Sequence, residues 1–138
     1  MSALLTMTDV DAFYGSAHIL HRLSLAVQPG ERVALIGRNG VGKTTVVNTI
    51  LGLAQLKGGQ IRLGDKIITR PRPYIAAQHG TVVVPQGRRI VANLTVEENL
   101  QMGLAYKSAS TPIPPELFEL FPVLKQMLGR RGGDLSGG

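Results

Sequence analysis

The sequence has no cysteine and no tryptophan, and it contains only three tyrosines and three phenylalanines. Without cysteine, disulfide bonds and thiolate metal sites are excluded. So few aromatic side chains offer no platform on which nucleic-acid bases could stack. No stretch approaches the roughly 18 apolar residues of a membrane-spanning helix. Residues 1–10 lack the basic start and apolar centre of a signal peptide, so we expect no secretion signal. These absences are compatible with a cytosolic protein.

The charge balance is basic, with 15 Lys and Arg against 9 Asp and Glu, a net charge of +6 in 138 residues. The length is that of one ordinary domain. A basic balance is typical of proteins that bind nucleic acid or an anionic membrane surface. The arginines, however, occur as scattered pairs (Arg70/Arg72, Arg88/Arg89, Arg130/Arg131) rather than as a stripe. This favours a solvated basic surface, and we expect no nucleic-acid partner.

A phosphate-binding loop of the Walker A type is indicated by residues 37–44, which match G-x-x-x-x-G-K-T. The apolar run 33–36 precedes the loop and predicts a strand, and the run 44–53 predicts a helix after it. Strand, glycine-rich loop and helix in this order are what phosphate binding needs. Glycine at positions 37, 40 and 42 allows positive φ and close approach to an anion. The competing interpretation is an ordinary glycine turn.

Each part of this loop has an expected role. The amides of residues 39–44 form a nest for phosphate oxygens, and the helix N-terminus favours negative charge. Lys43 reaches the β- and γ-phosphates, the Thr44 hydroxyl is a ligand of Mg²⁺, and Thr45 adds a phosphate contact. The predicted ligands are therefore the phosphates of a nucleotide and Mg²⁺. The predicted nucleotide-binding residues of the loop are Gly37, Arg38, Asn39, Gly40, Val41, Gly42, Lys43, Thr44 and Thr45.

The rest of the first part of the chain reads as mostly β-structure. Alternating apolar residues predict strands, and Pro71 and Pro73 indicate an irregular segment over 70–80. The predicted strands are 4–10, 19–27 and 31–36, a hairpin over 60–68, and the apolar strand 81–84.

After Gln86 the pattern becomes helical. Thr95 and Glu98 have the spacing of a capping box, which predicts a helix from Val96 to about Ala105. Residues 107–115 are rich in Ser, Thr and Pro and predict a linker. Apolar residues at helical spacing follow, and Pro122 splits them into two short helices. We therefore expect an ATP-binding β-rich part over 1–86 and a helical part over 87–138.

Four motifs in register resemble those of ATP-binding cassette (ABC) proteins across the whole chain. They are Tyr14 ahead of the phosphate loop, Gln86 after three valines and a proline, the segment 94–100 (LTVEENL), and the signature LSGG at 135–138. The resemblance implies an α/β fold, the P-loop NTPase fold of an ABC-type nucleotide-binding domain. This domain has an N-terminal β-rich subdomain, a RecA-like core that is partial here, and a helical subdomain.

The resemblance also implies roles for residues outside the loop. Tyr14 stacks on adenine, although it could instead pack in a turn. Gln86 is the catalytic-site glutamine that contacts Mg²⁺ and the attacking water and links the site to membrane subunits, although it could be an exposed loop amide. Within the signature Leu135, Ser136, Gly137 and Gly138, the serine and the last glycine face ATP held by a partner subunit. Ser136 can also be a helix N-cap.

The transported solute is suggested only by finer resemblance. Residues 37–45 and 84–89 resemble ATPase subunits for branched-chain amino acids and for urea, and 120–135 is closest to the urea type. We therefore expect a urea importer, with branched-chain amino acids or short amides as the alternative. Residues 71–78 and 90–93 depart from the family pattern near its contacts with membrane subunits.

Parts of the family's catalytic apparatus do not occur in the sequence. No apolar strand ending in Asp-Glu follows the signature, so the Mg²⁺-holding Asp and the general-base Glu (Walker B) are absent, as is a switch histidine. His18, His21 and His79 precede the signature and are expected to be surface or packing residues. The expectation is an N-terminal fragment of a longer subunit that does not hydrolyse ATP alone.

The resemblance implies partners and location as well. A second ATP-binding subunit completes a dimer, two integral membrane permease subunits bind it, and a solute-binding protein acts indirectly. The complete subunit would lie peripherally on the cytoplasmic face of the cell membrane. Two alternatives remain: a soluble ABC protein of translation or DNA repair, and a non-hydrolysing binding module that pairs with a full-length subunit and blocks it.

Overall fold

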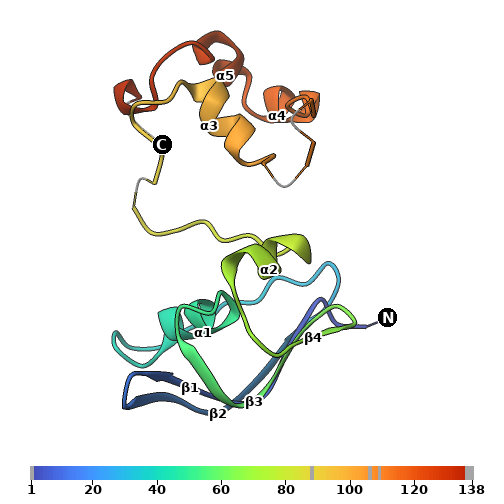
Figure 1. Ribbon diagram of the computed structural model, residues 1–138, viewed down its shortest axis with the longest axis vertical. Coiled ribbons are helices and arrows are strands. Elements are labelled where there is room, and N and C mark those ends of the chain that lie inside the picture. The colour runs from blue at the N-terminus through green and yellow to red at the C-terminus, as the bar shows by residue number, and fades with distance from the viewer. Residues whose placement is uncertain (1, 88, 106, 109, 136–138) are drawn as a thin grey trace. The chain divides into compact units, whose positions relative to one another are not determined.

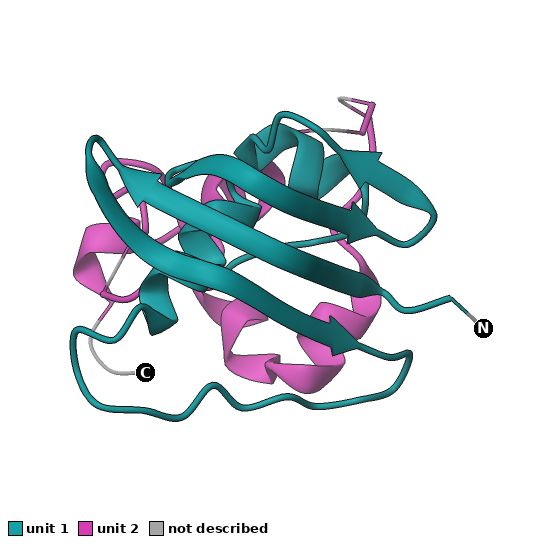
Figure 2. Cartoon of the chain, turned by 90° about the horizontal axis from the view of Figure 1, so that it is seen from below, with its two compact units in different colours: residues 1–83 teal, residues 84–138 magenta. Residues whose placement is uncertain are grey.

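The computed structural model describes residues 2–87, 89–105, 107–108 and 110–135. The chain divides into two compact units, residues 1–83 and residues 84–138 (Figure 2). The division falls between Val83 and Val84, where the sequence changes from β-rich to helical.

The first unit is built on a four-stranded antiparallel sheet of order β2-β1-β3-β4 (Figure 1). The strands are β1 (Leu5–Tyr14), β2 (Ala17–Val27), β3 (Gln55–Leu63) and β4 (Lys66–Ile68). The strands predicted over 4–10 and 19–27 and the hairpin over 60–68 are confirmed, and β1 is longer than expected. Gly64, with φ of +55°, makes the tight turn between β3 and β4.

Strand β1 contains an irregularity that decides which side chains reach the core. Met7, Val10 and Ala12 are all buried, although strict alternation would place Met7 and Val10 on opposite faces. Asp9, with φ of +47°, lies in the break of register between Met7 and Val10. This β-bulge adds one residue and returns Val10 to the buried face.

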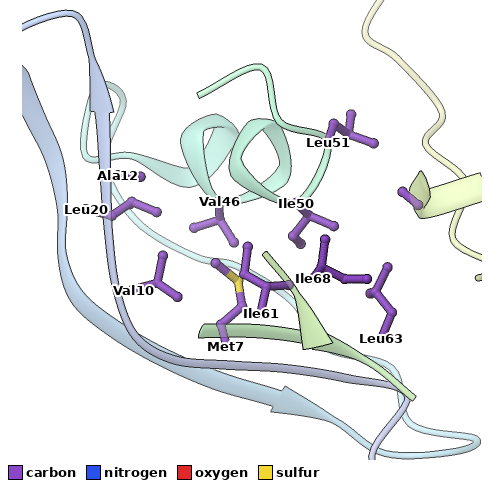
Figure 3. Close-up of a cluster of buried hydrophobic side chains, with 11 residues drawn as sticks. Met7, Val10, Ala12, Leu20, Val46, Ile50, Leu51, Ile61, Leu63 and Ile68 are labelled. Atoms are coloured by element: carbon purple, nitrogen blue, oxygen red, sulfur yellow. The ribbon is translucent and has the colours of Figure 1, made fainter. Parts of the chain in front are cut away.

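Helix α1 (Lys43–Ile50) packs on one face of the sheet, and the core of the first unit lies between them (Figure 3). Val46 and Ile50 point from α1 toward Met7 and Ile61. Burying side chains of this size stabilises a fold by about 1.5–3 kcal/mol each. The helix predicted over 44–53 is confirmed, but it ends at Ile50. The buried cluster consists of Met7, Val10, Ala12, Leu20, Val46, Ile50, Leu51, Ile61, Leu63, Ile68 and Ala76.

The prediction of an irregular segment over 70–80 is wrong, because helix α2 (Pro73–Gln78) forms there. Pro73 occupies the first helical turn, where its fixed φ suits a helix and its missing N–H costs no hydrogen bond. Ala76 of α2 is buried in the core cluster. At this position proline therefore begins a helix instead of interrupting one.

The strands predicted over 31–36 and 81–84 do not form. Within the described residues, no strand pairs with either segment. Ile36 and Val84 are each 92% exposed. Apolar sequence alone does not make a strand, because the backbone N–H and C=O groups need a neighbouring strand.

The second unit contains α3 (Val96–Met102), α4 (Pro115–Leu120), α5 (Pro122–Met127) and a 3-10 helix, η1 (Gly132–Asp134). The capping box is confirmed: Thr95 Oγ1 accepts from the Glu98 amide at 3.1 Å, and Glu98 Oε2 accepts from the Thr95 amide at 2.7 Å. The division into two short helices at Pro122 is also confirmed. Helix α3 ends three residues earlier than the predicted Ala105.

Asn99 of α3 holds the preceding segment in place. Its Oδ1 accepts from the Val91 amide, and its Nδ2 donates to the carbonyl oxygens of Val91, Leu94 and Thr95. None of the helices in the described part of the chain has the length and hydrophobicity that crossing a membrane requires.

Candidate functional site

The glycine-rich loop runs from Gly37 to Gly42 and leads directly into α1. Gly40 and Gly42 have φ of +82° and +104°, as predicted, and Gly42 is the N-cap of α1. The expectation of a positive φ at Gly37 is wrong. Gly37 matters sterically instead, because a Cβ there would lie 3.0 Å from Cγ2 of Val41, across the loop.

Strand β2 supports the end of the loop. A Cβ on Gly42 would lie 3.1 Å from Cδ2 of Leu20 and 3.5 Å from Cγ2 of Ile19. Leu20 is buried in the core, so the loop rests on a side chain that is itself fixed by packing. A side chain at position 42 would meet both strain at positive φ and crowding from β2.

Lys43 is the first residue of α1, and its side chain turns back over the loop. Its Nζ donates to the carbonyl oxygens of Gly37 at 2.7 Å and Arg38 at 2.6 Å. An ammonium group has three donors, so two are used by the loop itself. The arrangement places a positive charge within the curl formed by the glycines.

The N-terminus of α1 is suited to an anion. Gly42 has no side chain to cap it, and the first turn contains no acidic residue. The unpaired amides and the helix dipole of such an end attract negative charge. Thr44 is exposed at this end, whereas Thr45 is only 6% exposed and accepts, at its carbonyl oxygen, a bond from the Thr49 hydroxyl. Little of the Thr45 side chain is thus accessible, and its phosphate contact stays a prediction.

Tyr14 ends β1 and is linked to the helix that follows the loop. Its hydroxyl oxygen accepts a hydrogen bond of 2.7 Å from Nδ2 of Asn48, which lies on α1. The tyrosine is 41% exposed, so much of its ring is accessible. Sequence reasoning missed Asn48, and no sequence signal marks it, because α1 also contains Lys43 and three threonines.

The remaining predicted residues belong to the second unit. Gln86 is exposed in a bend, and Leu135 is half-buried just after η1. Ser136, Gly137 and Gly138 of the signature, like Arg88, lie outside the described residues. The roles of Gln86 and of the signature therefore stay predictions.

A polar and aromatic cluster on β1 and β2 also escaped prediction. His18 Nε2 is 2.8 Å from Asp11 Oδ1, and the His18 ring stacks on Phe13 at 4.1 Å between centroids. The His21 ring lies 3.8 Å from that of His18. The amide of Arg22 donates to Asp11, and this bond, followed by that from His18, holds the pKa of the Asp11 carboxyl below its usual value. His18 is thus an exposed residue that packs against Phe13, in line with the expectation of a surface or packing residue.

The described residues contain no group of three His, Cys, Asp or Glu side chains that could hold a metal ion. Next to the loop, the exposed Thr44 hydroxyl offers one oxygen atom as a ligand for a metal ion. A single protein oxygen fits Mg²⁺, because this ion binds few protein ligands and completes its coordination with phosphate oxygens and water.

Comparison with known proteins agrees with this geometry. The family model described as "ABC transporter" matches residues 20–138. The high-affinity branched-chain amino acid transport ATP-binding protein BraG of Pseudomonas aeruginosa is 40% identical over 98% of this chain and 59% of its own length. A probable branched-chain amino acid transport ATP-binding protein, LivF, of Archaeoglobus fulgidus is 33% identical over 98% of this chain and 58% of its own. The chain thus spans about three-fifths of these relatives.

Solved structures show the same fold. An ATP-binding cassette of an ABC transporter in its ADP conformation superimposes with a TM-score of 0.75 and 26% identity, over 99% of this chain and 60% of that one. A second structure of an ATP-binding cassette gives a TM-score of 0.74 at 27% identity, with the same coverage. The predicted fold class is confirmed. Together with the loop, α1 and the family match, these similarities show that the chain belongs to the ABC transporter family and has the fold of its ATP-binding domain.

Proposed function

We propose that this chain binds Mg-ATP and forms part of the motor subunit of an importer. The observation that carries the proposal is the position of Lys43, whose Nζ lies within the glycine loop at the uncapped N-terminus of α1. A triphosphate would replace the Gly37 and Arg38 carbonyls as the partner of this ammonium group. Thr44 would supply a hydroxyl to Mg²⁺, and the loop amides would hold the phosphates.

The proposal also assigns a site for the adenine base and residues that face a second subunit. The Tyr14 ring is the surface on which adenine stacks. Gln86 would contact Mg²⁺ and the attacking water, and the signature residues Leu135, Ser136, Gly137 and Gly138 would face the ATP of a second subunit. Closure of two such subunits around ATP would drive two membrane permeases between conformations, with the pair on the cytoplasmic face of the membrane. In this proposal the ATP-binding part spans residues 1–86 and the helical part spans residues 87–138.

The test compares Mg-ATP binding by the purified chain with binding by Lys43→Ala. Lys66→Ala, which removes a charge from the exposed hairpin strand β4, is the matched control. Lys43→Ala should abolish measurable binding, and Lys66→Ala should bind as the wild type does. Equal binding by all three proteins would contradict the proposal.

Hydrolysis requires groups that this sequence does not contain. Phosphoryl transfer depends on positioning and on charge stabilisation, to which a Walker B carboxylate pair and a switch histidine contribute. We therefore propose that the 138-residue chain binds ATP without turning it over and that the complete subunit hydrolyses it. Turnover of about 1 s⁻¹, within the ordinary range of enzymes, would contradict this.

The solute is proposed from the relatives. BraG and LivF are named for branched-chain amino acid transport, which favours these amino acids as the transported class. Urea is the alternative, carried by the resemblance of residues 120–135. Uptake of radiolabelled leucine and of radiolabelled urea by cells whose chromosomal copy carries Lys43→Ala would separate the two, because only the uptake that this protein energises should fall.

A further inference from the structure

Tyr14 and Asn48 lie 34 residues apart in sequence and are joined by the 2.7 Å bond between Nδ2 and the hydroxyl oxygen. Asn48 lies five residues after Lys43 on α1, about 7.5 Å further along the helix axis. One rigid element therefore carries both the lysine of the phosphate loop and the amide that contacts the aromatic ring.

The ring needs such a contact to be held in one position. Tyr14 is the last residue of β1, and Gly15, with φ of +58°, begins the turn to β2. A partly exposed side chain beside a turn samples several rotamers, and a ligand that requires one of them must offset the lost freedom. The Asn48 amide restricts the ring before any ligand binds.

The frame around the two residues is itself fixed. The carbonyl oxygen of Asn48 accepts from the amides of Leu53 and Ala54, which fixes the end of α1 to the two residues that precede β3. Gly42 packs on Ile19 and Leu20 of β2, which anchors the other end of the helix. The Tyr14–Asn48 bond thus joins the β1–β2 turn to a helix that is held at both ends.

We propose that Asn48 is a positioning residue for the nucleotide base: it holds the Tyr14 ring at a set place relative to the phosphate loop, so that a purine can stack on the ring while its triphosphate occupies the loop. This inference rests on the proposed function and deepens it. Asn48 touches neither base nor phosphate. Its effect appears only with ligands that carry a base.

The test measures two probes, Mg-ATP and Mg-tripolyphosphate, on the full 138-residue chain by isothermal titration calorimetry. The variants are Asn48→Leu, which removes the donor and keeps the number and branching of side-chain heavy atoms, Tyr14→Phe, which removes the hydroxyl and keeps the ring, and the double variant. Val47→Ala is the matched control, since it truncates the neighbouring side chain of α1, which is 37% exposed.

Asn48→Leu and Tyr14→Phe should each weaken Mg-ATP binding about threefold to tenfold, the range for one hydrogen bond. The double variant should lose no more than either single variant, because the same bond is removed once. Mg-tripolyphosphate affinity should stay unchanged in all variants, and Val47→Ala should bind both probes as the wild type does.

Three outcomes would overturn the inference. If the wild type binds Mg-ATP and Asn48→Leu binds it equally well, Asn48 does not position the base, while the proposed function stands. If Asn48→Leu weakens both probes equally, Asn48 only stabilises α1. If the wild type binds neither probe, the proposed function itself fails, and this inference fails with it.

Discussion

Gly59 of β3 and Asp9 of β1 approach so closely that a Cβ on Gly59 would lie 2.2 Å from the carbonyl oxygen of Asp9. Both residues have positive φ, +76° at Gly59 and +47° at Asp9. The bulge that turns Val10 into the core therefore depends on a glycine in the neighbouring strand. Position 59 has no room for a side chain larger than hydrogen.

Gly59→Ala should destabilise the first unit by about 2 kcal/mol or more, because backbone strain and a backbone clash add together. Gly30→Ala is the control, since Gly30 has nearly the same φ, +75°, and no atom within 4 Å of an added Cβ. Gly30→Ala should cost only about 1 kcal/mol. Urea unfolding measures both, and equal losses would show that the approach to Asp9 is not the cause.

The Asp11 carboxyl should make the stability of the first unit decrease at low pH. The bond from the Arg22 amide, and then that from His18, lowers its pKa in the folded state. A carboxyl with a lowered folded-state pKa stabilises the fold above its unfolded pKa, and this contribution is lost as the pH falls through the folded value. The wild type should thus be more stable than Asp11→Asn at pH 7, and the difference should shrink below about pH 4. Unfolding midpoints from pH 7 to pH 2.5 would test this. A difference that is constant with pH would contradict it.

The capping box should stabilise α3 beyond the effect of charge. Glu97 and Glu98 are both acidic residues of the first turn, but only Glu98 accepts from the Thr95 amide. Glu98→Ala and Thr95→Ala should each cost about 1 kcal/mol, and Glu97→Ala only a few tenths, because it removes a dipole interaction alone. Thermal unfolding followed by circular dichroism provides the measurement. Equal effects of the two glutamates would argue against the cap.

The lysine should order the loop even without a ligand. Because Lys43 Nζ bridges the carbonyl oxygens of Gly37 and Arg38, Lys43→Met should loosen the segment between them and α1. Amide hydrogen exchange over residues 37–42 of the ligand-free protein should become about threefold to tenfold faster. Exchange in β3, outside the loop, serves as the internal control. Unchanged exchange in the loop would mean that these two bonds do not restrain it.

The elements that could be predicted from sequence are those with local causes. Thr95 and Glu98 lie three residues apart, and Pro122 acts on its own turn, so both helix boundaries followed from adjacent residues. The hairpin over 60–68 followed from Gly64 and its alternating flanks. Helix α2 was missed because a proline at a first helical turn looks the same in sequence as a proline in a loop, and only the burial of Ala76 decides between them.

In the candidate site, too, the features with local causes could be predicted and the long-range contacts could not. The spacing of Gly40, Gly42 and Lys43 by itself determined a loop with positive φ that leads into a helix, because these properties reside in the backbone of neighbouring residues. Only the tertiary structure decided that Asn48 contacts Tyr14 and that Asp9 and Gly59 approach each other at the bulge. Each of these depends on residues brought together from distant parts of the chain, and hydrogen-bond partners at such separations are settled by packing rather than by local preference.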